Sequence, residues 1–285
     1  MSSFDATLRS AGRWVRGTVP HVDGPVLSLW DAYLRLYPHV VNRPHALRIG
    51  PRVPFEPFKV VSVDPDRIAH MVEYSALPAQ ARERTVFDRP KYTYAGAVRS
   101  GDWDRTDRRF EDSDIYRSFE AHFARDVPWA ETPFFRTAIK HIQRGTELWG
   151  CETRADFEAR CRSLDVLFES IRRNGYRSQR ELAAATADDL FVEEGPSLPF
   201  RVRLVNHEIA VCIGRDGEFL FKDGRNRLAI AKVLDLDAIP VWLMLRHEEW
   251  HRRRDAIAAG LDRLAELEPD LRTHPDLVDL EPGNP

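Results

Sequence analysis

The chain has 285 residues with 43% hydrophobic content, which is enough for one large domain or two small ones with a substantial core. Its 42 basic and 45 acidic residues give a formal net charge of -3, which excludes a polycation that binds nucleic acid without specificity. Three cysteines without metal-type spacing exclude a disulfide scaffold and a cysteine zinc site, so we expect reduced thiols and a cytoplasmic location.

A helical arm with a linker is predicted for residues 1–58. Trp14 lies among arginines in a short amphipathic segment, and a second apolar segment runs from Val26 to Tyr37 and ends at Pro38. Four prolines in residues 44–57 predict the linker. We expect the arm to pack on the main domain or on a second copy of the chain, with binding to an anionic membrane surface as the alternative. No apolar run in the sequence reaches the roughly 20 residues of a transmembrane helix.

An aromatic-rich stretch follows a short strand that is predicted at residues 59–63. The stretch covers about residues 70–150 and includes a helix-like pattern at residues 115–123. Aromatic side chains at this density usually fill a core. The alternative is that they line a substrate pocket, since pockets are mostly apolar with a few polar groups.

A long helix is predicted after this stretch. Thr153 is a suitable N-cap, Asp156 completes a pattern close to a capping box, and Gly175 is suited to end the helix. Beyond the helix, the alternation of apolar and basic residues at positions 200–204 predicts a strand.

The rest of the chain is organised around the stretch from Glu208 to His247. Apolar residues 209–213 and 219–221 flank a Gly-containing turn, which predicts a hairpin. A Gly-containing loop then leads into a helix, and residues 239–241 open another strand. The predicted order is strand, turn, strand, loop, helix and strand.

The loop at the start of this helix has the properties of an anion site. Free backbone N–H groups and the positive end of the helix dipole face whatever lies there. Arg225 and Arg227 add two guanidinium groups, which suit a nucleotide phosphate. The alternative is a hairpin and a helix whose arginines are only solvated.

Residues 223–227, with the sequence Asp-Gly-Arg-Asn-Arg, resemble the phosphate-binding loop of the ParB/sulfiredoxin superfamily. Residues 167–176 are similar to the Ser-Ile helix, ending in Gly, that precedes the sheet in that superfamily. Together the two segments span about residues 153–247. The superfamily includes plasmid-partition proteins that use CTP, sulfiredoxins that use ATP and kinases that phosphorylate free serine. The resemblance therefore implies a fold and a nucleotide but leaves several functions open.

Three departures from the superfamily affect these expectations. Asn226 stands where sulfiredoxins and the serine kinases have His, and the loop has no counterpart of the sulfiredoxin catalytic Cys, so a sulfinyl reaction is not expected. About ninety residues separate the strand at 59–63 from the helix at Thr153, many more than in ParB-like chains, which predicts an insertion.

The resemblance also implies cofactors and their contacts. They are ATP or ADP, with CTP as an alternative, together with Mg2+. The phosphates are expected at four residues of the loop and at a hydroxyl opposite them: Gly224, Arg225, Asn226, Arg227 and Ser170. Asp223 either holds the metal ion or fixes the loop by accepting hydrogen bonds from backbone N–H groups.

A phosphotransferase also needs a carboxylate that orients or deprotonates the acceptor hydroxyl. In the serine kinases this carboxylate lies about a dozen residues before the Ser of the Ser-Ile helix, which points to Asp156 and Glu158 as catalytic residues. The alternative is that both only favour the first turn of the helix. Glu208, at the entry to the central strand, is a further candidate.

A competing motif lies at the end of the central stretch. His247, Glu248 and His251 match the His-Glu-x-x-His pattern of zinc hydrolases. Three arginines follow directly and oppose a dication, and a third ligand has to come from the C-terminal tail. The alternative is a helix start whose Trp250 packs on the sheet. A helix is predicted to about Leu267, followed by a loose acidic tail.

These observations predict an α/β (α+β) protein with a ParB/sulfiredoxin-like core over residues 59–252, an aromatic insertion at about 70–150, and extensions at residues 1–58 and 253–285. We expect a nucleotide-dependent phosphotransferase that acts on a small hydroxyl-bearing substrate. The alternative is a noncatalytic nucleotide-binding switch or a DNA-associated ParB relative, and a zinc hydrolase is a minor alternative. No basic helix-turn-helix module follows the core, which disfavours nucleic acid as a partner. A homodimer is compatible with the sequence.

Overall fold

The computed structural model describes residues 23–72, 89–184 and 198–280, so the amphipathic segment around Trp14 lies outside the described residues. The α-helices are α2 (Asp23–Val41), α3 (Arg43–Ile49), α4 (Asp114–Phe119), α5 (Pro133–Ile142), α6 (Arg154–Asn174), α7 (Gln179–Ala184), α8 (Phe200–His207), α9 (Arg225–Val233), α10 (Glu248–Ala258) and α11 (Pro269–Arg272). The short 3-10 helices are η1 (Pro65–Arg67), η3 (Lys91–Tyr94), η5 (Trp129–Glu131) and η7 (Leu264–Glu266), and η4 (Glu120–Ala124) is a π-helical turn. Within the described segments, no helix combines the length and the apolar character that crossing a bilayer requires.

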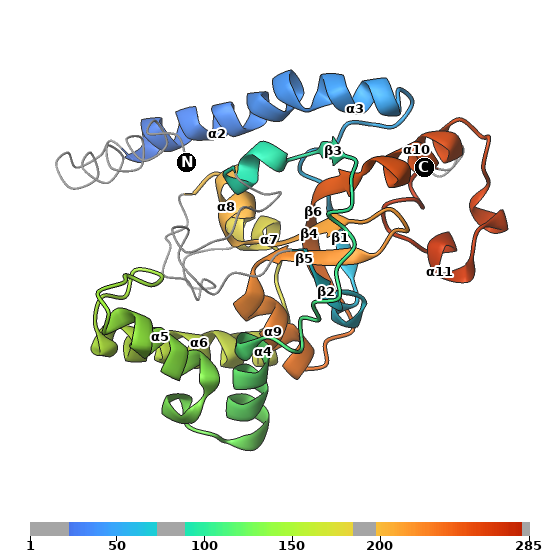
Figure 1. Ribbon diagram of the computed structural model, residues 1–285. Helices are drawn as coiled ribbons and strands as arrows, with labels where there is room; N and C mark the ends of the chain where they lie inside the picture. The colour runs from blue at the N-terminus through green and yellow to red at the C-terminus, as the bar shows by residue number, and fades with distance from the viewer. Residues whose placement is uncertain (1–22, 73–88, 185–197, 281–285) are drawn as a thin grey trace.

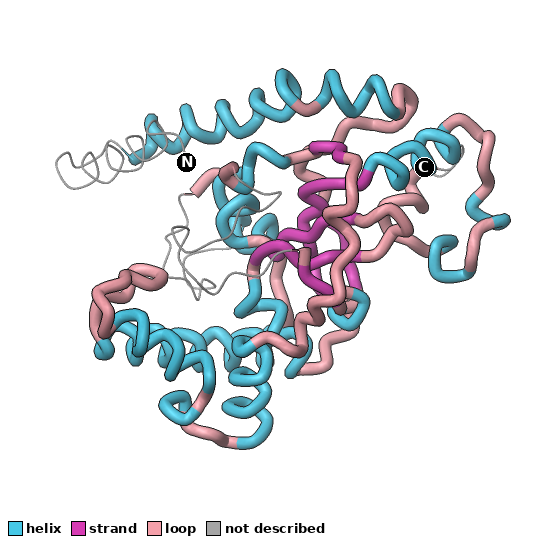
Figure 2. The backbone as a smooth tube through the Cα atoms, in the orientation of Figure 1, coloured by secondary structure: helices cyan, strands magenta, loops and turns pink. Residues whose placement is uncertain are grey.

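Six strands form one mixed sheet (Figure 2). They are β1 (Val60–Val63), β2 (His70–Met71), β3 (Ala97–Arg99), β4 (Ile209–Ile213), β5 (Phe219–Asp223) and β6 (Ile239–His247). Their order is β1-β6-β4-β5-β2, and β3 also pairs with β6. The predicted hairpin is confirmed, because β4 and β5 are antiparallel. Strand β6 runs parallel to β4 and antiparallel to β1. The chain is therefore an α/β protein, as its sequence predicts.

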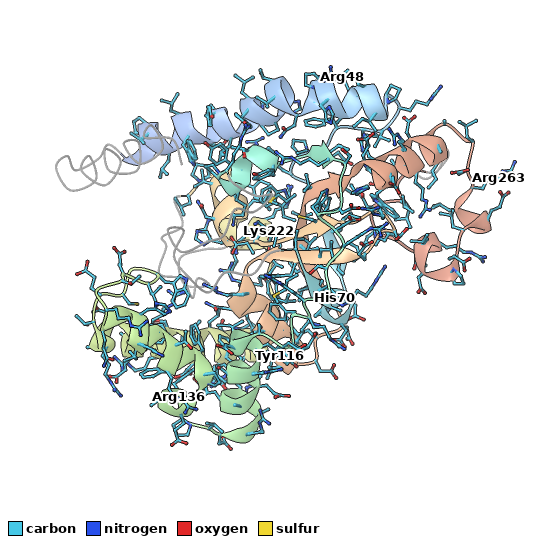
Figure 3. The ribbon with its side chains drawn as sticks, viewed as in Figure 1. Arg48, His70, Tyr116, Arg136, Lys222 and Arg263 are labelled. Atoms are coloured by element: carbon cyan, nitrogen blue, oxygen red, sulfur yellow. The ribbon has the colours of Figure 1, made fainter. Side chains whose placement is uncertain are left out.

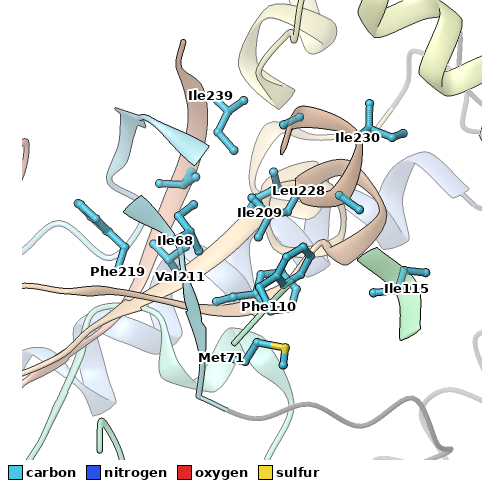
Figure 4. Packing of buried hydrophobic residues seen from close by; sticks show 14 of the residues in the cluster. Ile68, Met71, Phe110, Ile115, Ile209, Val211, Phe219, Leu228, Ile230 and Ile239 are labelled. Carbon is cyan, nitrogen blue, oxygen red and sulfur yellow. The ribbon is translucent and has the colours of Figure 1, made fainter. Parts of the chain in front are cut away.

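The central strands are buried on both faces. Ile209, Val211 and Ile213 belong to one hydrophobic cluster, which also contains residues of α4, α6 and α9. Their neighbours Ala210 and Cys212 belong to a second cluster with residues of α2 and α8. This division follows from the two-residue period of a strand. Figure 4 shows the first cluster at the contact between α9 and the sheet.

Two helical layers cover the sheet (Figure 1). Helices α2 and α3 lie along one side, and α4, α5 and α6 form the layer on the other side. Figure 3 places Arg48 of α3 and Tyr116 of α4 on opposite sides of the sheet. Helix α6 begins with the predicted capping box, in which Thr153 and Asp156 satisfy each other's backbone N–H groups. The buried aromatic residues of the predicted insertion fill the core on this side: Phe110, Phe119, Trp129, Phe134 and Phe135.

The N-terminal region differs from the expectation in two places. Helix α2 continues through Pro38 to Val41 instead of ending there. Asn42, at the junction with α3, donates hydrogen bonds to the carbonyl oxygens of Thr93 and Ala95, at 3.0 and 2.9 Å, which anchors both helices to the core. The predicted linker is wrong at its start, because α3 occupies residues 43–49. Its proline lies in the first turn, where a missing N–H has no consequence.

The strand predicted at residues 200–204 is also wrong, because these residues begin helix α8. Four consecutive residues, 202–205, are buried. The five-residue alternation in the sequence is too short to distinguish a strand from a buried helix, and packing against α2 and α7 decides for the helix.

The C-terminal region is more ordered than its composition indicates. Helix α10 ends at Ala258 rather than near Leu267. The expectation of a loose tail is wrong for residues 269–280, because α11 forms there and both His274 and Asp276 are completely buried. Charged residues of the core bind this segment and keep it ordered. The local composition does not reveal these distant contacts.

Candidate functional site at the edge of the sheet

Three chain segments meet at one edge of the sheet. By this edge we mean the strand ends where β4 and β6 begin and β5 ends. Ile209 of β4 lies beside Val241 of β6, and Ala210 is paired with Asp223 of β5. Helix α9 starts directly after β5, so its N-terminus lies at this edge. Glu208, the residue before β4, lies at the same edge.

The start of α9 has the geometry expected of the loop. Gly224 is the N-cap in a left-handed conformation with φ of 93°, and its N–H donates to Oδ1 of Asp223 at 2.8 Å. Among the described residues, no side chain caps this helix. A Cβ atom at position 224 would lie 2.9 Å from Cα of Ile209, so the loop passes against β4 too closely for any other residue.

Replacement of Gly224 by Ala should lower the free energy of unfolding by about 2–3 kcal/mol, since the left-handed conformation and the backbone contact both oppose a side chain. Gly145 provides a matched control, because it also has a positive φ of 78° but has open space where its Cβ would lie. We expect Gly145→Ala to cost about 1 kcal/mol. Urea denaturation of both proteins measures the difference. Equal losses would show that the contact with Ile209 is unimportant.

The three polar residues of the first turn of α9 have different surroundings. The guanidinium group of Arg225 lies over the ring of Trp149, with Cζ 4.6 Å from the ring centroid. Arg227 donates a hydrogen bond to the carbonyl oxygen of His207. Oδ1 of Asn226 is buried and has no hydrogen-bond partner among the described residues. Arg225 therefore stacks on Trp149, while Arg227 holds the loop against α8.

Asp223 fixes the loop, which is the second of the two roles considered for it. Besides its bond to the Gly224 N–H, its carboxylate forms an ion pair with Lys91 of η3, 132 positions earlier in the chain. The pKa of Asp223 lies below its ordinary value, because the effect of desolvation, which raises it, is outweighed by the Lys91 ammonium group. Lys91 thereby brings a positive charge to the start of α9.

Glu208 is a buried carboxylate with a strongly perturbed pKa at this edge. Its side chain is almost completely buried, with 1% of the residue exposed. Oε2 accepts a hydrogen bond of 2.9 Å from the backbone N–H of Gln179, and Oε1 has no partner among the described residues. Burial raises the pKa of Glu208 to about 7, although the Gln179 N–H and Arg227 oppose the rise. The hydroxyl group of Tyr176 interacts with the same carboxylate.

A pocket of about 980 Å3 opens beside Glu208. It lies along edge strand β1 and the start of β6, and helices α2, α7 and α8 complete its wall. Its basic and aromatic lining residues are Arg35, His39, Lys59, Arg180, Arg201, Phe58, Tyr176 and Phe200. Arg201 is paired with Asp31 at 2.9 Å and Lys59 with Asp279 at 2.6 Å. The pocket thus combines aromatic surface with several cationic groups, a composition that suits a small polar ligand.

The residues predicted on α6 are placed as follows. Ser170 is half-buried near the end of α6, and Tyr176 just beyond this helix reaches the site, but Ser170 itself is not among the pocket-lining residues. The Asp156 carboxylate accepts the capping-box hydrogen bond from the Thr153 N–H, and Glu158 is paired with Arg154 at 2.8 Å. At 1.5 Å per residue, Asp156 lies about 21 Å along the helix axis from Ser170. The contacts of Asp156 and Glu158 are those of a helix N-terminus.

The histidines of the zinc motif make hydrogen bonds within the described part of the protein and are not grouped around a metal site. His247 is the N-cap of α10: Nδ1 accepts from the Glu249 N–H at 3.1 Å, and Nε2 lies 2.9 Å from the Gly101 carbonyl oxygen. Nε2 of His251 lies 3.2 Å from the Ala46 carbonyl oxygen. Over the described segments, no three His, Cys, Asp or Glu side chains are grouped as metal ligands. Trp250 is completely buried, which agrees with the structural interpretation of this motif.

Three residues of the site are not evident from sequence motifs. Lys91 is one of only five lysines in an arginine-rich chain, which was the one available signal. Tyr176 directly follows the helix-ending Gly175, and Gln179 begins α7. Neither residue type nor spacing indicated that these two would contact Glu208, because the contacts depend on how α7 packs beside β4.

The chain was compared with protein-family models, with curated proteins and with solved structures, and none of these comparisons gave a match.

Proposed function

We propose that the protein is a nucleotide-dependent phosphotransferase with a ParB/sulfiredoxin-like core that acts on a small hydroxyl-bearing substrate. The observation that carries this proposal is the position of Glu208. Its buried carboxylate, with a pKa of about 7, lines the pocket of about 980 Å3, and the next residue, Ile209, lies against the Gly224 loop at the start of α9. A general base works best when its pKa is near the operating pH.

The anion site of this proposal is the start of α9. The helix N-terminus, Arg225, Arg227 and the nearby Lys91 all favour negative charge there. The order of β4, β5, the Gly224 loop, α9 and β6 also supports the resemblance to the ParB/sulfiredoxin superfamily. A nucleotide bound there supplies the phosphoryl group.

In the proposed reaction, the acceptor occupies the pocket with its hydroxyl group directed at Glu208. The ionised carboxylate takes the hydroxyl proton while the acceptor oxygen forms a bond to the terminal phosphorus atom. The bond between that phosphorus and the bridging oxygen breaks, and the nucleotide product leaves with the electron pair on that oxygen. Arg225 and Arg227 stabilise the charge on the phosphoryl oxygens. The backbone N–H of Gln179 holds the carboxylate in position.

A dedicated Mg2+ site does not fit the residues at this edge. Both carboxylate oxygens of Asp223 are engaged, one by Gly224 and the other by Lys91. Mg2+ is usually bound through one or two carboxylates together with substrate phosphates. We therefore derive no step through a metal ion, and the charge at the anion site comes from Lys91 and the arginines.

Replacement of Arg225 by Ala should weaken binding of ATP or ADP by about 10- to 100-fold, because charge-assisted hydrogen bonds to phosphate contribute about 1.5–3 kcal/mol. The shift of the melting temperature with nucleotide concentration measures this affinity. Arg263→Ala is the matched control, since Arg263 is exposed and lies far from α9 (Figure 3). Unchanged affinity of the Arg225 variant would place the phosphate site elsewhere.

Turnover separates the proposed enzyme from a noncatalytic nucleotide switch. The assay follows phosphoryl transfer from γ-labelled ATP to a panel of hydroxyl-bearing metabolites, beginning with free serine. Acceptor-dependent formation of ADP supports the phosphotransferase. Tight nucleotide binding without transfer to any acceptor would favour the switch, with preference for CTP pointing to the partition-like relatives.

A further inference from the structure

Helix α2 carries an apolar stripe on its outer side. Eight large hydrophobic residues are exposed in the part of the chain that the structure describes, and six of them lie on this helix. They are Val26, Leu29, Tyr33, Leu36, Val40 and Val41, and we call them the α2 stripe. The exposed fraction reaches 74% at Leu29 and 62% at Leu36. In the view of Figure 1, no other described element lies beyond the outer side of α2.

The spacing of the stripe is that of a helix-helix interface. From Val26 to Val40, its members follow one another by three, four, three and four residues. This heptad spacing keeps a seam facing a second helix, as in coiled coils. A neighbouring side of α2 already packs on the core, because Leu34 is 1% exposed in the second core cluster and Leu27 and Trp30 pack against it. A helix with two apolar sides needs a second partner.

The extent of the stripe suits a pair of identical helices. Six residues with these exposed fractions present about 500–670 Å2, if a fully accessible large residue has about 150–200 Å2. Such an area is at the upper limit of the largest apolar patch on a typical monomer, about 300–600 Å2. Two copies that cover each other's stripe bury about 1,000 Å2 or more, which reaches the size of a specific interface.

We propose that the protein forms a homodimer in which the α2 stripes of two copies pack against each other. A twofold axis makes this contact self-complementary, because each copy presents the same seam. Tyr33 lies at the centre of the stripe and therefore faces its own copy in either a parallel or an antiparallel arrangement. A membrane surface is less suited to α2, because a membrane-bound amphipathic helix is flanked by several Lys or Arg residues. Here Arg35 is the one Lys or Arg within α2.

Sedimentation equilibrium of the full chain tests the dimer. At concentrations of about 1–100 μM, where association depends on mass action, we expect the wild type at twice the 32.9 kDa of one chain. The double variant Leu29→Glu/Leu36→Glu should sediment as a single chain. Both positions are exposed, so the introduced charges oppose association but do not enter the hydrophobic core. Leu261→Glu is the matched control: Leu261 is 77% exposed but lies outside the stripe, so this variant should remain dimeric.

Disulfide trapping locates the contact independently. The three native cysteines are buried, so a single introduced thiol reports alone. Under mild oxidation, Tyr33→Cys should form a covalent dimer, whereas Ser28→Cys, exposed on α2 outside the stripe, should not. A wild type that stays monomeric at all concentrations, or a dimer that survives the double Glu substitution, would overturn the proposal. So would a monomer that binds anionic vesicles through α2. Nucleotide-induced melting shifts are measured on the same variants, so a failure of the dimer is distinguishable from a failure of the proposed function.

Discussion

The Glu208→Gln variant should be more stable than the wild type at pH 8 by about 3 kcal/mol and should have lost phosphoryl transfer. Burial raises the pKa of Glu208 from 4.5 to about 7. Between these pH values, the folded protein holds a proton that the unfolded chain has lost, so this group makes the wild type less stable as the pH rises. Gln keeps the neutral form at every pH. The stability advantage of the variant should be small near pH 4.5 and complete above pH 7.

Two buried histidines change the unfolding free energy with pH in the direction opposite to Glu208. Burial lowers the pKa values of His251 and His274 to about 4. Because both histidines bind a proton more readily when unfolded, they make the protein more stable as the pH rises through the range from 4 to 6.5. This contribution is common to both proteins and cancels in the difference. Urea denaturation at pH 5 and pH 8 therefore isolates the effect of Glu208.

Loss of phosphoryl transfer in Glu208→Gln would show that Glu208 is a general base and not only a buried carboxylate that destabilises the fold. Removing a general base usually lowers the rate by about 100- to 10,000-fold. Glu218→Gln is the matched control, since burial also raises the pKa of Glu218 but this residue lies at the opposite end of β5. We expect that variant to retain transfer. If Glu208→Gln transfers phosphate at the wild-type rate, another group accepts the proton.

The Asp276→Asn variant should lose about 3–5 kcal/mol of unfolding free energy, because it leaves buried arginines without their counter-charge. Asp276 is completely buried and accepts two hydrogen bonds from Arg246, at 2.8 and 2.7 Å. Arg254 lies 3.2 Å from the same carboxylate, and Trp250 donates to it at 3.0 Å. Although burial raises the pKa of Asp276, the arginines hold it far below its ordinary value. Its contribution is therefore present above about pH 4 and declines in acid.

Asp279→Asn is the matched control for this network. Its side chain is 47% exposed, and it forms an ion pair with Lys59 at 2.6 Å. Asp279 is half-exposed, and Lys59 keeps a second carboxylate, Asp276, at 3.4 Å when Asp279 is neutralised. This variant should therefore lose less than about 1 kcal/mol and unfold close to the wild-type urea concentration. Asp276 lies outside the start of α9 and does not line the pocket, so nucleotide affinity should persist in any Asp276 variant that still folds. Similar stability of the two variants would show that the buried network contributes little.

The sequence by itself determined the elements whose signals lie within a few residues. The hairpin of β4 and β5, the start of α9 after Gly224 and the capping box of Thr153 each depend on local backbone preferences, and each was predicted. The proposed anion site at the start of α9 depends on the same local chemistry, because the helix alone places its first N–H groups and arginines. Local patterns were less informative at residues 200–204, where a short alternation fits both a strand and a buried helix.

Only the tertiary structure decided which distant groups share an environment. The pairing of β4, β5 and β6 brings Glu208 to the start of α9, and the packing of α7 buries its carboxylate and raises its pKa. The same folding carries Lys91 across 132 positions to Asp223, and places Asp276 between arginines of β6 and α10. The sequence alone does not show whether a charged side chain is buried or which group it pairs with. Its pKa, and therefore its capacity for chemistry or stability, is set when the fold removes it from water and chooses its neighbours.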